Sequence, residues 1–419
     1  MYSTFGILGF GLLIGTPVAF TLALAGLAYI VTAGEYPSTF ASVLFGSLNS
    51  TTMLSIPFFI LSAEILNRSG ATHKLIDMVD AWIGHRRGGL PVVAVTATIF
   101  FSTICGSSAA TAAAVGSVMI PEMLQRGYNR TFSVGLIATA GGLGIVLPPS
   151  IPLIIYGMVT ETSIAALFKA ATLPGLALAA LLIIFAYVMG ARSQVAPSPK
   201  QPMSVRMRTV REAGGVLILP VIILGGIYSG YFTPTEASAV ACIYALLLAL
   251  FVYRTPLGRL PAMLTLSAST AGMILLIIAG ATLFSYALTA VRLPHAIFEY
   301  ISAMDLAGWQ LITALMLFFL VLGMFLEVIS VILITMPILM PLLSASGIDL
   351  VHFAVLLILN MELAVITPPI GLNLFVISAV SKVPVLRVFK GTLPFVVAVF
   401  IVLLSLMFMP GATRLTIGW

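Results

Sequence analysis

Charged residues are scarce in this chain. Asp, Glu, Lys and Arg make up 8% of its 419 residues, whereas a soluble domain carries roughly a quarter. So few charges cannot cover a water-facing surface, which excludes a soluble globular protein. Hydrophobic residues make up 60% and form continuous runs such as Leu176–Val188, Val216–Ile227 and Leu311–Met324. Because the runs do not alternate with polar residues, a β-barrel is also excluded, and the sequence predicts an all-α polytopic membrane protein.

Catalytic and metal-binding motifs are missing as well. The only two cysteines, Cys105 and Cys242, lie in apolar segments without metal-ligand spacing, so neither a disulfide framework nor a metal site is indicated. The chain has no phosphate-binding GxxxxGK[ST] loop and no HExxH, and its four histidines are scattered. We therefore predict no catalytic residues and no enzymatic activity. The net charge of +6 comes from links between apolar runs, which favours membrane orientation over nucleic-acid binding.

Prolines, in contrast, recur at a fixed interval of 220 residues. The matching positions are Pro121 with Pro341, Pro148-Pro149 with Pro368-Pro369, and Thr172-Leu173-Pro174 with Thr392-Leu393-Pro394. An ungapped match of this kind indicates an internal repeat. We predict a first repeat over 1–190, a cytoplasmic linker over 191–213 and a second repeat over 214–419.

The apolar runs predict about ten transmembrane helices. They cover 2–14, 17–33, 40–66, 132–159, 168–190, 214–232, 235–253, 262–290, 352–380 and 390–409. Two further segments, 91–120 and 311–340, are interrupted by small and polar residues, and we interpret them as re-entrant helical hairpins.

The basic residues then predict an orientation for each half. The links at 67–90, 121–130, 191–212, 253–260 and 381–390 hold 16 of the 19 Lys and Arg residues, so we place them in the cytoplasm. This is possible only if the first hairpin opens to the cytoplasm and the second to the opposite side. The two repeats then have inverted topology, with both termini outside, as in many secondary transporters.

The helices predicted at 132–159 and 352–380 each contain a Pro-Pro pair. Proline removes a backbone donor and pushes the preceding residue out of helical geometry, so both helices should break inside the membrane. Carbonyls freed before the break can coordinate a cation, and the positive end of the following half-helix can face an anion. Ser150, Thr367 and Asn373 add side-chain oxygens there. The alternative is a simple kink, which is less favoured when two pairs occupy corresponding positions.

The hairpin tips are the other candidate sites. The first tip contains the small and hydroxyl residues of the string CGSSAAT, from Cys105 to Thr111, which suit either ligand binding or close helix packing. The second tip, from Gly323 to Ser330, contains Glu327. An acid inside a membrane is a functional candidate, although Glu327 could equally be a structural carboxylate bonded to backbone amides. For Glu64, Glu236 and Glu362 a structural role is favoured.

Four strings together resemble a known family. GSSAATAAAVGSVMIPEM, GLGIVLPPSIPLIIYG, GGIYSGYFTPTEASAVA and NMELAVITPPIGLNLFV are similar, in this order, to the large membrane subunit of tripartite ATP-independent periplasmic (TRAP) transporters. The resemblance implies sodium-coupled import of an organic acid across a bacterial inner membrane. It also implies an elevator-type motion of a transport domain against a scaffold domain. Its implied partners are a separate small four-helix membrane subunit and a periplasmic substrate-binding protein.

The resemblance places sodium sites at the tips and breaks, with sodium as the only cofactor. The implied sodium ligands are Gly106, Ser107, Ser108 and Thr111 at the first tip, and Thr367, Pro368, Gly371 and Asn373 beside the second. The predicted substrate contacts are Ser108, Pro149, Ser150, Glu327, Thr367 and Asn373. One departure is Asn360-Met361-Glu362, where small or hydroxyl residues are expected, and it leaves the role of Glu362 open.

Two other functions remain alternatives. The fold of the family resembles the ion-transporter superfamily. A stand-alone sodium–anion symporter of that superfamily needs no binding protein, and uptake without a soluble partner would identify it. A non-transporting scaffold or receptor is disfavoured by the two hairpins and two breaks. The sequence does not choose among sialic acids, C4-dicarboxylates, other sugar acids and keto acids.

Overall fold

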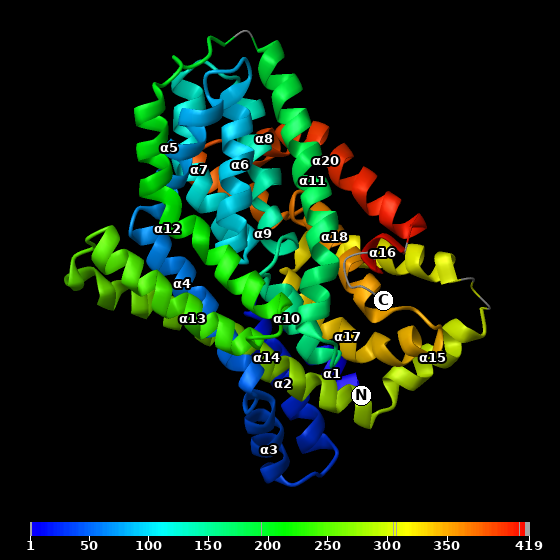
Figure 1. Cartoon of the computed structure of the whole chain (residues 1–419). Coiled ribbons are helices and arrows are strands. Elements are labelled where there is room, and N and C mark those ends of the chain that lie inside the picture. Colours follow the sequence, from blue (N-terminus) through cyan, green and yellow to red (C-terminus); the bar gives the residue numbers. More distant parts are fainter. Residues whose placement is uncertain (1, 194, 305, 307, 410, 415–419) are drawn as a thin grey trace.

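The protein is a bundle of helices in the computed structural model, which describes residues 2–193, 195–304, 306, 308–409 and 411–414 (Figure 1). No strand occurs among these residues. The helices of the first half are α1 (Tyr2–Leu13), α2 (Val18–Thr32), α3 (Pro37–Leu48), η1 (Thr51–Leu54), α4 (Ser55–Arg68), α5 (Ala71–Ile83), α6 (Gly89–Cys105), α7 (Ser108–Gln125), α8 (Arg130–Gly141), α9 (Leu143–Val146), α10 (Ile151–Val159) and α11 (Ile164–Arg192). Those of the second half are α12 (Met203–Tyr228), α13 (Pro234–Leu247), η2 (Leu248–Val252), η3 (Leu257–Arg259), α14 (Leu260–Ala290), α15 (Leu293–Ser302), α16 (Gly308–Phe325), α17 (Val328–Ala345), α18 (Leu350–Val365), α19 (Leu372–Ser381), α20 (Val385–Phe408) and α21 (Gly411–Arg414).

A first group of helices is built around α14, which packs along α2, α3 and α4, while α13 packs on α4 (Figure 1). Small residues bring α2 and α14 into backbone contact. A Cβ atom added to Gly26 would lie 2.6 Å from the carbonyl carbon and oxygen of Leu283, and one added to Gly280 would overlap the carbonyl oxygen of Ala19. Close approach at glycine is a general way for membrane helices to associate.

A second group contains α6 to α11 and α16 to α20, and α8 and α18 form its centre. Every residue of α18 from His352 to Val365 is buried, as is every residue of α8 from Ser133 to Gly141. α8 packs on α7 and α20, and α18 packs on α16 and α20. A helix that is apolar all round and buried on all sides belongs in the core, so these two helices position the segments that follow them.

Helix boundaries in the two halves follow the same 220-residue spacing as the prolines. α7 and α17 begin at Ser108 and Val328, and α8 and α18 begin at Arg130 and Leu350. Both Pro-Pro peptide bonds, Pro148-Pro149 and Pro368-Pro369, are cis. The opposite membrane orientation of the two halves remains a prediction.

The helices of the structure differ from the predicted segments in three places. The helix expected over 40–66 is divided at Asn49-Ser50, where α3 and the η1–α4 helix meet at 60°. Asn, Ser and Thr favour turns over helix interiors, and Asn49-Ser50-Thr51-Thr52 concentrates them. The link expected over 67–90 contains the amphipathic helix α5, which packs on α6 and α12. α12 begins at Met203, inside the predicted linker. The segment between α11 and α12 is therefore 193–202, of which residue 194 lies outside the described residues.

The part of the chain that the structure describes has fewer candidate membrane spans than the ten helices predicted from the sequence. Within the described residues, eight helices are long and apolar enough to cross a membrane, or nine if the bent pair of α3 and η1–α4 counts as one span. The arms of the second hairpin, α16 and α17, are among the eight. α2 and α18 are shorter apolar helices, because α2 ends near Gly34 and α18 ends at its Pro-Pro break.

Candidate functional site

The first hairpin turns at Gly106 and Ser107, between α6 and α7. Gly106 has φ +63°, a left-handed conformation that favours glycine, and it ends α6. A Cβ atom on Gly106 would lie 2.9 Å from the carbonyl oxygen of Pro149. Ser107 then begins α7, and its carbonyl accepts the Thr111 amide at 3.1 Å. The tip therefore sits directly against the first Pro-Pro break.

The second hairpin turns at Leu326 and Glu327, between α16 and α17. Glu327 is the N-cap of α17, and its carboxylate accepts a hydrogen bond from the Ile329 amide at 3.1 Å. A carboxylate in this position satisfies an amide that has no partner within the helix. The side chain is nevertheless exposed, and it faces a cavity described below. Glu327 thus has the structural role weighed from the sequence and remains accessible to a ligand.

Each tip is hydrogen-bonded to the half-helix that follows a Pro-Pro break. The amide of Ile151, the first residue of α10, donates to the Gly106 carbonyl at 3.3 Å. The amides of Ile370 and Gly371, just before α19, both donate to the Met324 carbonyl at 3.2 Å. The positive ends of α10 and α19 therefore point toward the tips, and their role in facing an anion stays a prediction.

A cavity of about 550 Å³ separates the tips from the first group of helices. On one side it is lined by both tips and the start of α10, and on the other by α2, α4 and α14. Four of the predicted site residues line it, namely Gly106, Ser107, Ser108 and Glu327. Ile151 and Pro152 place the start of α10 in the same wall. The cavity therefore brings together segments from both halves of the chain.

The other predicted residues lie behind this wall. Ser150 is fully buried and donates its hydroxyl to the Ile145 carbonyl at 2.6 Å, and Pro149 is buried beside Gly106. The Thr111 hydroxyl is buried and forms no hydrogen bond of normal geometry among the described residues, although the Cys105 thiol is nearby. A Cβ atom added to Gly144 would lie within 2.7 Å of both the Thr111 hydroxyl and the Ser107 carbonyl oxygen.

The residues predicted around the second break are divided between two places. Thr367 donates its hydroxyl to the Leu363 carbonyl at 2.6 Å, and its own carbonyl lies against Gly371. Pro368 follows it and is half-buried. Asn373, in contrast, reaches α8, where its amide donates to the Ala138 carbonyl at 3.1 Å. Its side-chain oxygen is buried and has no hydrogen-bond partner among the described residues.

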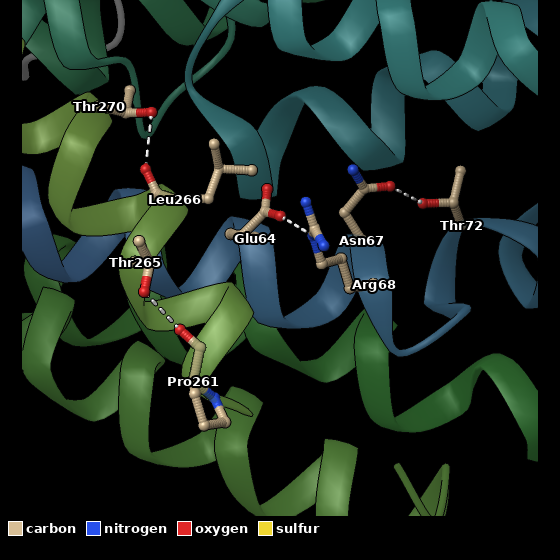
Figure 2. A network of polar contacts seen from close by, with 8 residues as sticks. All are labelled: Glu64, Asn67, Arg68, Thr72, Pro261, Thr265, Leu266 and Thr270. Atoms are coloured by element: carbon tan, nitrogen blue, oxygen red, sulfur yellow. Dashed lines mark hydrogen bonds and ion pairs between the residues drawn. The ribbon is translucent and has the colours of Figure 1, made fainter. Parts of the chain in front are cut away.

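Sequence reasoning missed the opposite wall of the cavity. Glu64, Asn67 and Thr270 line it, and Figure 2 shows them on neighbouring turns of α4 and α14. The Arg68 guanidinium is paired with the Glu64 carboxylate, one turn before it on the same helix. The signal that could have found this wall is Glu64, an acid within an apolar run. Among the residues that the structure describes, the cavity lining contains two carboxylates, of Glu64 and Glu327, and no Lys or Arg.

Comparison with known sequences gives matches over almost the whole chain. Residues 5–412 match the family described as tripartite ATP-independent periplasmic transporter, DctM component. The C4-dicarboxylate TRAP transporter large permease protein DctM of Pseudomonas aeruginosa is 38% identical over 95% of this chain and 94% of its own. The sialic acid TRAP transporter large permease protein SiaM of Vibrio cholerae is 37% identical, over 99% and 97%. The isethionate TRAP transporter permease protein DctMQ of Oleidesulfovibrio alaskensis is 34% identical, over 97% of this chain but 64% of its own.

Two solved structures share the fold at low sequence identity. The Alcanivorax borkumensis YdaH transporter superposes with a TM-score of 0.65 and 13% identity, covering 91% of this chain and 89% of its own. Neisseria gonorrhoeae MtrF superposes with a TM-score of 0.61 and 16% identity, covering 91% and 84%. At these identities the likeness concerns the fold alone.

Proposed function

Because the chain belongs to the DctM-component family of tripartite ATP-independent periplasmic transporters, we propose that it imports an organic acid together with sodium. As a large permease of this family it is a multi-pass protein of the inner membrane, and it is a transporter subunit rather than an enzyme. A C4-dicarboxylate or a sialic acid fits the names of two relatives. Their identities to this chain, 38% and 37%, are too close to favour either substrate.

The proposal includes two protein partners. A tripartite system needs a small membrane subunit and a periplasmic binding protein that delivers the substrate, and we assign both to this permease. The relative of which the chain covers only 64% is named as a joined DctMQ protein, which fits a small subunit that is joined to the large one there. Delivery by a binding protein also explains how related permeases serve different acids.

One observation supports the proposed transport mechanism: each hairpin tip makes the same kind of contact with a broken helix. Both contacts combine a hairpin turn, a Pro-Pro break and the amide end of a half-helix, with hydrogen bonds of 3.2–3.3 Å. Backbone carbonyls around such breaks are free to bind a cation, while the half-helix amides attract an anion. We assign sodium to these two places, with the carbonyl of Ser107 and the hydroxyl of Thr111 at the first, and Thr367, Pro368 and Gly371 at the second. Asn373, which reaches α8, is the weakest of the proposed ligands.

An elevator motion is the form of transport that the cavity favours. Its two walls belong to different helix groups, with the tips on one side and α2, α4 and α14 on the other. We propose that α6–α11 and α16–α20 move as the transport domain against a scaffold that includes α2, α4, α13 and α14. A substrate held at the tips would then cross the membrane with that domain.

Reconstituted uptake tests the proposed function directly. The permease with its small subunit in proteoliposomes should accumulate succinate or N-acetylneuraminate only when an inward sodium gradient and a cognate binding protein are both present. Omission of each component in turn is the control. Uptake without the soluble protein would indicate a stand-alone symporter, and uptake independent of sodium would contradict the coupling.

We expect Thr367→Ala to weaken the sodium dependence of uptake. The change removes one oxygen at the second break, and the loss of one such contact is worth about 1–2 kcal/mol, or roughly a tenfold higher half-saturating sodium concentration. The measurement is initial uptake rate against sodium concentration. Thr367→Ser keeps the hydroxyl and should keep the sodium curve, whereas an unchanged curve for Thr367→Ala would remove this residue from the proposed ligands.

Gly144→Ala should disturb the proposed first sodium site through the packing of the tip, although Gly144 itself does not line the cavity. A Cβ atom there would lie 2.5 Å from the Ser107 carbonyl oxygen and 2.7 Å from the Thr111 hydroxyl, so the tip must shift. Overpacking of this kind costs about 1–3 kcal/mol, and we expect the half-saturating sodium concentration to rise about tenfold.

The matched control for Gly144→Ala is Gly214→Ala, because nothing lies within 4 Å of a Cβ at Gly214. Both variants are assayed at equal amounts of folded permease. A sodium curve that is the same in both would show that the tip does not depend on its packing against Gly144.

A further inference from the structure

The charge of the cavity lining does not match an anionic substrate. Glu64 and Glu327 place two carboxylates in the wall, and within the described part of the chain no basic side chain accompanies them there. A carboxylate that enters a low-dielectric site beside two others is repelled unless a cation is close. Sodium and the half-helix amides can offset part of this repulsion at the tips. The opposite wall, on α4 and α14, needs a cation of its own.

Arg68 is the basic residue placed to supply it. Arg68 lies at the last turn of α4, directly after the lining residue Asn67 and four residues after the lining residue Glu64. Residues four apart share one face of a helix. Arg68 is not itself in the lining, but its pairing with Glu64 places the guanidinium next to a lining side chain. Figure 2 shows this guanidinium beside the Glu64 carboxylate, with Leu266 of α14 on the other side of Glu64. α14, in contrast, contains no basic residue, and the nearest base before it is Arg259 at the end of η3, seven residues before the lining residue Leu266.

The ion pair holds the Arg68 guanidinium in place but does not use all of its N–H donors. Arg68 Nε is bonded to one oxygen of Glu64, and the Arg68 side chain remains 45% exposed while that of Glu64 is 17% exposed. Arginine has five N–H donors in a planar fork, which can pair with a carboxylate through two parallel bonds. A partly exposed pair four residues apart on a helix is weak, so exchange of Glu64 for a substrate carboxylate is not costly.

We propose that Arg68 binds a carboxylate of the transported organic acid, and that Glu64 holds the guanidinium at the cavity edge until the acid arrives. The proposal rests on the organic-acid transport proposed above and names the residue that recognises the charge. It also explains why an acid lines a cavity for anions, since Glu64 orients a base rather than facing the substrate alone. A plain structural ion pair is the competing explanation, and it makes a different prediction for the two partners.

The test is protection of a cysteine in the cavity wall. Ala110 is exposed and lines the cavity, so Ala110→Cys in a chain that also carries Cys105→Ser and Cys242→Ser gives a single reporter thiol. Its labelling rate by N-ethylmaleimide is measured in saturating sodium against increasing succinate or N-acetylneuraminate. The concentration that halves the rate reports binding at this cavity without requiring transport or a binding protein.

In this chain, Arg68→Gln should raise the half-protecting concentration at least tenfold, and Arg68→Lys should give an intermediate rise. Glu64→Gln should lower it, because the guanidinium is then released to the ligand. If the ion pair is only structural, Arg68→Gln and Glu64→Gln should change the half-protecting concentration in the same direction. Changes in the same direction, or no change in Arg68→Gln, would overturn the proposal.

Arg208→Gln is the matched control. Arg208 forms the same kind of pair, with Glu212 four residues on, but lies on α12 and does not line the cavity. It should leave protection unchanged. If neither acid protects the parent chain while both are taken up in proteoliposomes, transport stands and the binding role of Arg68 at this cavity fails. If neither acid is taken up either, the proposed function fails for a C4-dicarboxylate or a sialic acid as the substrate.

Discussion

Gly135→Ala is expected to yield almost no folded protein. A Cβ atom at this position of α8 would overlap the carbonyl carbon, carbonyl oxygen and Cα of Gly391 in α20. All three are backbone atoms, so no change of rotamer relieves the overlap and the two helices must separate. Side-chain overpacking already costs about 1–3 kcal/mol, and a backbone clash in the middle of a helix pair should exceed that range.

Separation of α8 from α20 would also disturb the proposed site. α8 leads through α9 to the first Pro-Pro break, and α20 follows α19, which begins just after the second. The measurement is the fraction of monodisperse protein on size-exclusion chromatography in detergent, with the thermal unfolding midpoint of any recovered protein. Gly225→Ala is the control, because nothing lies within 4 Å of a Cβ there. A Gly135→Ala protein as stable as this control would contradict the helix contact.

Gly142→Ala should destabilise the protein for a different reason, and a second substitution should reverse the effect. A Cβ atom at Gly142 would overlap the carboxyl group of Glu362. Glu362 is fully buried, and neither of its oxygens has a hydrogen-bond partner among the described residues. The carboxyl group therefore has little room to move aside, and we expect a loss of about 1–3 kcal/mol.

Glu362→Ala removes the obstacle, so Gly142→Ala should cost little in that background. The four chains of this double-mutant cycle are compared by thermal unfolding, and direct neighbours typically show a coupling of about 0.5–3 kcal/mol. Glu362→Ala alone should not be strongly destabilised, since it removes an unpaired buried polar group. Equal destabilisation by Gly142→Ala with and without Glu362 would show that the carboxyl group is not what limits the space.

The broken helices and the tips could be predicted from the sequence because their causes are local. Proline at 148–149 and 368–369 cannot continue a helix, and Gly106 permits the left-handed turn that ends α6. The sequence causes of helix α5 are local too, but its charged residues led to its assignment as part of a link. Its apolar residues recur at helical spacing, and that periodicity was the better guide.

Glu64 alone gave a sequence signal for the opposite wall of the cavity. The assembly of that wall could not be predicted, because its causes are not local. Glu64 and Thr270 are more than 200 residues apart and meet only through the packing of α4 on α14. Asn373 shows the same limit. Its partner Ala138 is 235 residues away, and the equivalent of Asn373 in the first half is Leu153, so the repeat gives no indication of the contact.

The contact between Gly142 and Glu362 joins positions that are 220 residues apart, the spacing at which the prolines recur. The two halves therefore meet at the same position of each, and one small volume is shared between them. A larger side chain fits at one of these two positions only if the residue at the other position is small. Substitutions at these two positions are therefore constrained together, because the glycine of one half makes room for the glutamate of the other.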